Sequence, residues 1–188
     1  MKSGLGRGLL EALIQRSNTT IIAGVRKLTD PTVKSLESLQ TGSGSKIIPV
    51  VINSTDDSSA QKAIELIKTQ HGITKLDIVI ANAGISKYYG IAAITPISEV
   101  RDHFEVNIVG TIVLFQATWP LLKLSSNPMF VALSTGAASI GDMDTIPIPA
   151  TAYGMSKVAL NYMVRKIHFE NPELIAFPIS PGYVDSVH

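Results

Sequence analysis

The sequence predicts an α/β fold in which a three-layer, doubly wound parallel sheet is covered by helices on both faces. Two observations support this prediction. Short runs rich in Ile, Val and Ala alternate with helical patterns, and most of these runs are apolar on both alternating sides, as buried parallel strands are. The intervals between them are long enough for right-handed crossovers. The predicted strands are Thr20–Val25, Lys46–Ile52, Leu76–Ala81, Met129–Ser134 and Leu174–Ile179.

Helical patterns fill most of the intervals between the strands. Leu5–Arg16 and Asp57–Thr69 each place apolar side chains on one face. Ile97–Leu122 is long enough for two helices, and Pro120 is expected to mark an end or a kink. The last predicted helix is Ala152–Phe169.

Length and composition bound the class of protein. A chain of 188 residues, 45% hydrophobic and 16% charged, predicts a single folded domain over residues 1–188. A net charge of +1 gives no reason to expect a nucleic-acid or anionic-membrane partner. Cysteine is absent and the four histidines have no ligand spacing, so no metal site is expected. No apolar run approaches the roughly 20 residues of a membrane span, and cytoplasmic localisation is the expectation.

A glycine-rich turn opens the first predicted helix, with Gly4, Leu5 and Gly6 at its start. Such turns let a backbone approach an anionic group, which helix N-terminal amides then bind. A flexible N-terminus explains this motif equally well when it is taken alone. Arg26 follows the first predicted strand, where a dinucleotide fold meets the adenosine ribose. A cation there suits a 2′-phosphate, and an ordinary solvated basic residue is the alternative.

Further polar and small residues lie where predicted strands end. Asn82 and Gly84 follow the third strand, Thr135 follows the fourth, and Pro181 and Gly182 follow the fifth. Open α/β sheets bind ligands at this edge. The Thr135 hydroxyl would donate a hydrogen bond to a substrate carbonyl there, although capping of the exit turn is the commoner role for such a residue.

Tyr153 and Lys157 are spaced i and i+4, so they share one face of the last predicted helix. A nearby ammonium favours the phenolate and should lower the phenol pKa, which makes the pair a plausible proton-transfer unit. Asn107 is a polar residue among apolar neighbours in a helical stretch, where an amide usually has a structural or water partner.

Taken in order, these motifs resemble those of the short-chain dehydrogenase/reductase family, whose sheet is Rossmann-like. Within the family, the chain is most similar to the small group of norsolorinic acid ketoreductase-like and C-factor-like proteins. The resemblance covers essentially all 188 residues. It rests on the glycine-rich turn, on Ala81–Gly84 for the NNAG element, on Asn107, on the YxxxK pair Tyr153 and Lys157, and on the PG element Pro181–Val184.

The resemblance implies an oxidoreductase in which NADPH, favoured over NADH, delivers hydride to a ketone of a small metabolite such as a polyketide or an aromatic compound. Tyr153 would supply the proton, Lys157 would lower its pKa, Thr135 would polarise the carbonyl, and Asn107 would support a relay water. The implied cofactor-binding residues are Gly4, Leu5, Gly6, Arg26, Asn53, Asn82, Gly84, Tyr153, Lys157, Pro181, Gly182 and Val184. The two long helices resemble those of the family's dimer interface, so a homodimer or homotetramer is compatible with the sequence.

The chain departs from the family pattern at several points. Thr135 stands where the family has a catalytic Ser, so Ser134 or Ser139 is an alternative donor. Asn53 replaces the acidic residue that contacts adenine. The family's first strand and its C-terminal substrate cover have no counterpart, which favours a chain truncated at both ends. Two alternatives to the reductase stay open: a non-catalytic binding or scaffold protein, and a lyase, isomerase or cyclase that acts without net redox change.

Overall fold

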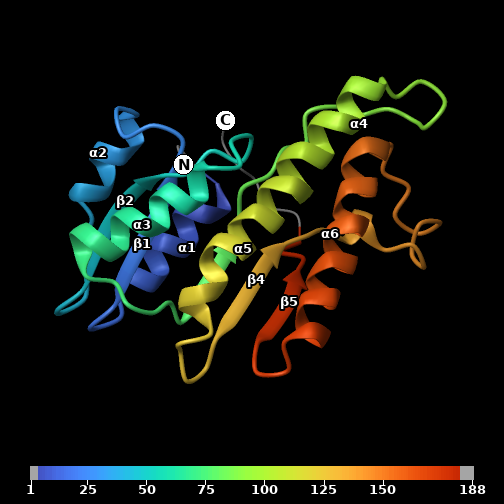
Figure 1. Ribbon diagram of the computed structural model, residues 1–188. Helices are drawn as coiled ribbons and strands as arrows, with labels where there is room; N and C mark the ends of the chain where they lie inside the picture. Colours follow the sequence, from blue (N-terminus) through green and yellow to red (C-terminus); the bar gives the residue numbers. More distant parts are fainter. Residues whose placement is uncertain (1–3, 183–188) are drawn as a thin grey trace. The chain divides into compact units, whose positions relative to one another are not determined.

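The strands of the computed structural model form two parallel sheets, one in each of two compact units. The structure describes residues 4–182, which divide into a unit that ends at Asn53 and a unit that spans Ser54–Gly182. Each sheet alternates with helices along the chain (Figure 1). Within the described residues, no hydrogen-bonded ladder joins the two-stranded sheet to the three-stranded one. The prediction of a single domain remains a prediction.

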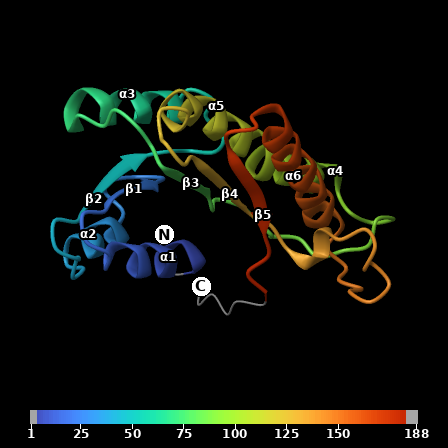
Figure 2. The same cartoon turned by 90° about the horizontal axis from the view of Figure 1, so that it is seen from below.

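The first unit pairs two strands in parallel. Its elements are α1 (Leu5–Ile14), β1 (Thr20–Val25), α2 (Pro31–Glu37) and β2 (Lys46–Val51). The register runs from Thr20 opposite Lys46 to Val25 opposite Val51. Both helices lie beside these strands (Figure 2). Leu10, Ala23 and Leu36 form one buried cluster of this unit, and Ile14 and Val50 are buried as well.

Helix α2 was not predicted from the sequence. Asp30 caps it, because a side-chain oxygen accepts a hydrogen bond from the Thr32 amide at 3.0 Å. Pro31 occupies the first turn, where its missing N–H is harmless. With seven residues, the helix is too short to display a clear apolar period.

The second unit holds three parallel strands in the order β3-β4-β5. Its elements are α3 (Ser59–His71), β3 (Ile78–Ala81), α4 (Ile97–Phe104), α5 (Gly110–Leu122), β4 (Met129–Leu133), α6 (Thr151–Glu170) and β5 (Ile175–Ile179). Figures 1 and 2 both show α5 and α6 along one face of this sheet. The parallel pairing and the alternation of strands with helices confirm the predicted α/β class.

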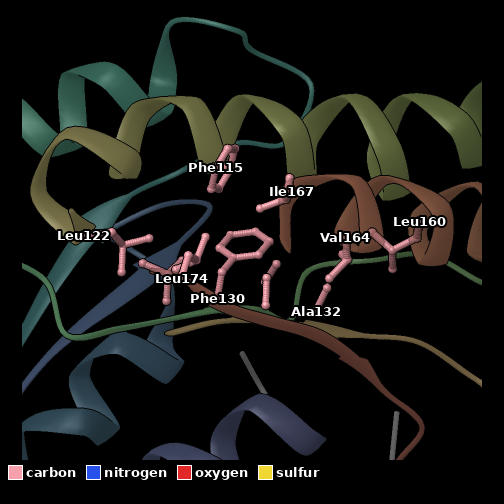
Figure 3. Close-up of a cluster of buried hydrophobic side chains, with 11 residues drawn as sticks. Phe115, Leu122, Phe130, Ala132, Leu160, Val164, Ile167 and Leu174 are labelled. Atoms are coloured by element: carbon pink, nitrogen blue, oxygen red, sulfur yellow. The ribbon is translucent and has the colours of Figure 1, made fainter. Parts of the chain in front are cut away.

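Phe130 of β4 lies at the centre of the main core, between α5, α6 and the sheet (Figure 3). Its ring packs edge-on against Phe115, with the ring centroids 5.2 Å apart. The Phe130, Leu122, Val164 and Leu174 side chains are fully buried. This core holds β4, which leads to Thr135, against α6, which carries Tyr153 and Lys157.

The helical region Ile97–Leu122 is continuous, but its winding changes in the middle. The turn Glu105–Val109 is π-helical and separates α4 from α5. Pro120 lies in the last turn of α5, two residues before the helix ends, so it marks an end as predicted. The region is long and apolar enough to cross a membrane, judged by length and composition alone. It nevertheless supplies Phe115 and Leu122 to the core. Its apolar composition therefore reflects packing inside the second unit.

Candidate active site

Tyr153 and Lys157 lie one turn apart at the start of α6, in the second unit. The Lys157 ammonium is 5.8 Å from the centroid of the Tyr153 ring. The i, i+4 spacing brings the two side chains together on one face of the helix, as the sequence predicts.

The Lys157 side chain is buried, and its ammonium donates a hydrogen bond to the Leu133 backbone carbonyl at 2.7 Å. Leu133 is the last residue of β4, so this bond ties α6 to the carboxyl end of a strand. Burial lowers the pKa of Lys157 to about 8, because an ammonium loses hydration inside the protein. No sequence motif predicts this contact, because it joins residues 24 positions apart.

Burial raises the pKa of the Tyr153 phenol above its ordinary value, and the Thr135 side chain opposes this by hydrogen bonding. The net direction in the chain by itself is therefore the opposite of the lowered pKa that the spacing of Tyr153 and Lys157 predicts. The physical reason lies in the contacts just described. The ammonium is directed to the Leu133 carbonyl, and the loss of hydration outweighs the groups that favour the phenolate.

The structure distinguishes the three hydroxyls proposed as carbonyl-polarising donors. Ser134 donates to the Asn161 side chain at 2.6 Å, and Ser139 donates to Asp142 at 2.7 Å. Thr135 lies at the N-cap of the short 3₁₀ helix Gly136–Ala138, where its hydroxyl accepts from the Ala137 amide at 3.2 Å. Of the three, Thr135 is the residue that acts on the Tyr153 phenol.

Asn107 is fully buried in the π-helical turn. Its side-chain oxygen accepts from the Ile85 amide at 2.8 Å, and its nitrogen donates to the Ile85 carbonyl at 3.1 Å and to the Ser156 hydroxyl at 2.9 Å. Ser156 precedes Lys157 on α6. The Asn107 amide thus joins the loop after β3 to the helix that carries Tyr153, and it serves the structural role that sequence analysis left open.

Gly84 lies against the same cluster. A Cβ atom placed on it would be 3.0 Å from the Asn107 side-chain oxygen and 3.4 Å from the Lys157 ammonium. The loop after β3 therefore approaches both groups closely because residue 84 has no side chain. Asn82, two residues earlier, is partly exposed at the carboxyl end of β3.

The remaining candidate residues of the second unit follow β5. Pro181 and Gly182 are exposed, and Gly182 has a φ of 77°, a left-handed conformation that glycine adopts without strain. Val184 lies outside the described residues.

The first unit contains the other candidate group. Gly4, at the N-cap of α1, has a φ of 96° and no side-chain cap hydrogen bond, and Leu5 and Gly6 form the first turn. Arg26 is exposed at the bend after β1, and Asn53 is exposed shortly after β2. The sequence predicted these positions relative to the strands correctly. That these residues bind a cofactor stays a prediction.

Comparison with known proteins identifies related chains. The profile of the family described as short chain dehydrogenase matches residues 1–188. The norsolorinic acid ketoreductase of Aspergillus parasiticus is 41% identical over 185 residues, which cover 97% of this chain and 68% of that protein. Norsolorinic acid ketoreductase stcE of Emericella nidulans is 39% identical, with 97% of this chain and 70% of that protein covered.

Solved structures agree with the fold. A short chain dehydrogenase/reductase from Saccharomyces cerevisiae matches with a TM-score of 0.83 at 24% identity, over 98% of this chain and 68% of that one. An NADPH-bound carbonyl reductase from chicken fatty liver matches with a TM-score of 0.81 at 22% identity, over 95% of this chain and 74% of that one. These similarities confirm the Rossmann-like fold that the sequence predicts.

Proposed function

The chain belongs to the short-chain dehydrogenase family, and from that premise we propose that it is an NADPH-dependent reductase of a ketone in a small polyketide or aromatic metabolite. Members of the family are oxidoreductases that bind nicotinamide cofactors, and the relatives of this chain include ketoreductases. The observation that carries the proposal is the grouping of Tyr153, Thr135 and Lys157 at the end of β4 and the start of α6.

Each of these side chains has a chemical task in ketone reduction. NADPH, when bound, supplies the hydride that reduces the carbonyl carbon. The Tyr153 phenol donates its proton to the carbonyl oxygen as that oxygen gains negative charge, so that an alcohol forms. With a pKa above its ordinary value, the phenol is protonated at neutral pH and holds the proton that it would donate. The Thr135 hydroxyl donates a hydrogen bond to the same oxygen and stabilises the developing charge.

Lys157 holds a positive charge beside the phenol. With a pKa of about 8, most Lys157 side chains are protonated at neutral pH. After the phenol gives up its proton, the ammonium stabilises the resulting phenolate. Lys157 would also hold the ribose next to the nicotinamide. Asn107 holds the loop after β3 against α6 through its side-chain hydrogen bonds. The π-helical turn that contains Asn107 would support the relay water.

Taken one unit at a time, the residues present have the chemistry that the parts of a nicotinamide dinucleotide require. In the first unit, α1 begins at a glycine-rich turn without a side-chain cap, so its amide groups suit a diphosphate. Exposed Arg26 suits a 2′-phosphate and favours NADPH, and Asn53 would hydrogen-bond the adenine. In the second unit, Asn82, Gly84, Pro181 and Gly182 would contact the nicotinamide half, together with Val184.

Membership of the family also supports proposals for the substrate, the oligomeric state and the cellular location of the protein. A small-molecule carbonyl compound is the proposed partner, and a homodimer or homotetramer is the proposed assembly. The cytoplasm is the proposed location.

Consumption of NADPH with a panel of aliphatic and aromatic ketones tests the proposal. We expect wild-type protein to oxidise NADPH only when a ketone is present, and Tyr153→Phe to reduce this rate by a factor of about 100 or more. Tyr162→Phe is the matched control, because Tyr162 lies exposed on the same helix. Equal rates in Tyr153→Phe and wild type would refute the role of Tyr153. Substrate turnover without NADPH loss would point to the non-redox alternative.

Cofactor binding is tested separately by thermal unfolding. NADPH should raise the melting temperature if the folded chain binds it. No change at millimolar NADPH would support the scaffold alternative.

A further inference from the structure

His103 is the buried residue of α4, a helix whose other side chains are partly or fully exposed. Its relative exposure is 0%. Neither the proposed proton transfer nor the proposed cofactor contacts use this side chain. A fully buried imidazole needs partners for both ring nitrogens, and the two it has belong to different segments.

The hydrogen bonds fix the protonation of the ring. Nε2 lies 3.4 Å from the Lys87 backbone nitrogen, whose N–H can only donate, so Nε2 is the acceptor. Nδ1 lies 2.6 Å from the Glu99 backbone carbonyl, which can only accept, so Nδ1 carries the proton. This arrangement places the proton of the ring on Nδ1 and leaves Nε2 as the acceptor. The imidazole therefore fastens α4 to the loop after β3 in a single orientation.

Charged groups surround this ring without displacing its backbone bonds. The Glu99 carboxylate is 3.8 Å from both the His103 Nδ1 and the Lys87 ammonium. Lys87 also pairs with Asp102 at 2.6 Å. Lys87 thus lies between two carboxylates of α4, and this reinforces the attachment of the loop to the helix.

The imidazole held in this way contacts the Tyr153 ring. The two ring centroids are 6.4 Å apart and the planes meet at 67°, an edge-to-face geometry. Lys157 lies 5.8 Å from the centroid of the same ring. We propose that His103 is a positioning residue: its edge contact with Tyr153 sets the orientation of the phenol for proton donation. The kinetic consequence of this contact rests on the proposed function, whereas the contact itself does not.

Two variants separate the ring contact from the hydrogen bonds. His103→Gln keeps hydrogen-bonding groups but loses the aromatic edge, and His103→Phe keeps the edge but loses both nitrogens. Arg101→Gln is the control, because Arg101 is exposed on the same helix. Tyrosines labelled with ¹³C at the ring carbon that bears the hydroxyl report on Tyr153 by NMR, and Tyr153→Phe assigns its signal. This measurement does not depend on activity.

We expect His103→Gln to move the Tyr153 signal and to lower its titration midpoint, since water enters the space left by the ring. His103→Phe should keep the signal near its wild-type position even if the protein melts earlier. With 1-tetralone and NADPH, kcat should fall about tenfold in His103→Gln, while the KM for NADPH stays within twofold. His103→Phe should retain kcat within threefold of wild type.

Either variant can overturn the proposal. A folded His103→Gln protein with an unchanged Tyr153 signal and midpoint would show that His103 only supports the fold. A displaced Tyr153 signal in His103→Phe would show that the aromatic edge does not position the phenol. If the signal responds as expected but wild-type protein reduces no ketone, the positioning contact stands and the proposed function fails.

Discussion

Lys157 illustrates how a buried charged side chain can reduce the stability of the fold. Its ammonium is buried and has the Leu133 carbonyl as its partner, so part of its lost hydration is not replaced. The pKa of about 8, against an ordinary value of 10.5, reflects that cost. A residue with this environment is retained at the expense of stability if its charge serves the reaction.

Replacing Lys157 with Met should therefore stabilise the protein while it abolishes ketone reduction. Below pH 8 the folded wild-type protein buries a charged ammonium, which lowers its unfolding free energy by the full amount. In the unfolded chain the same ammonium is hydrated. We expect the unfolding free energy at pH 7 to rise by about 2 kcal/mol, after allowance for the lost bond to Leu133. The gain should shrink as pH rises from 8 toward 10, since wild type then folds with a neutral amine. Urea unfolding across this range measures the difference. An advantage that grows with pH would contradict the prediction.

Gly84 gives a second prediction at the scale of a residue. Gly84→Ala places a methyl group 3.0 Å from the Asn107 oxygen, which must shift, and 3.4 Å from the Lys157 ammonium. We expect a loss of about 1–2 kcal/mol in unfolding free energy. Gly141→Ala is the control, because a Cβ atom there meets nothing within 4 Å and should change stability by less than about 0.5 kcal/mol. Similar losses in both variants would show that the close approach at Gly84 is unimportant.

At the scale of elements, the π-helical turn Glu105–Val109 brings Asn107 to both the loop after β3 and α6. The Asn107 side chain forms three hydrogen bonds, two with the backbone of Ile85 and one with the Ser156 hydroxyl. Because these partners are buried or partly buried, removing the amide leaves them without a replacement from solvent.

Asn107→Ala should accordingly destabilise the protein by about 3 kcal/mol, measured by chemical unfolding. Asn127→Ala, in an exposed turn, is the matched control and should be close to neutral. A neutral Asn107→Ala variant would mean that water replaces the amide and that Asn107 does not join these segments.

The elements differ in how visible they are in the sequence. The strands were predicted to within two residues at each end, because buried parallel strands are continuous apolar runs. The seven-residue α2 was missed, since it is capped by Asp30 rather than marked by a long apolar period. The π-helical turn also has no local signal, because it depends on the partners that Asn107 finds elsewhere in the unit.

The candidate site, like the elements, could be predicted from the sequence only in part. Tyr153 and Lys157 could be paired from their spacing, since a helix brings i and i+4 together. The Leu133 partner of Lys157 and the His103 contact with Tyr153 are non-local, and a single histidine in a helix gives no indication of its neighbours. The direction of the Tyr153 pKa depends on burial, which composition does not reveal.

At the scale of the whole molecule, the two units differ in the number of strands that they pair. The first has a two-stranded sheet, and the second has a three-stranded sheet with a core centred on Phe130. Sheets of two strands have only marginal stability of their own, whereas three or more strands with an apolar face are more stable.

We therefore expect amide hydrogens of β1 and β2 to exchange faster than those of β4, measured by hydrogen–deuterium exchange on the intact chain. NADPH should slow exchange at the start of α1 if that turn binds phosphate. Equal exchange rates for the amides of β1 and β4 without ligand would contradict the difference in stability that we infer from the two sheets.

The central claim is that Tyr153 donates the proton in an NADPH-dependent ketone reduction. NADPH carrying deuterium at the transferable position of its nicotinamide, incubated with 1-tetralone, tests it most directly. We predict an alcohol with deuterium on the carbinol carbon, formed at least about 100-fold more slowly by Tyr153→Phe. Deuterated alcohol formed at the same rate by wild type and Tyr153→Phe would contradict the account.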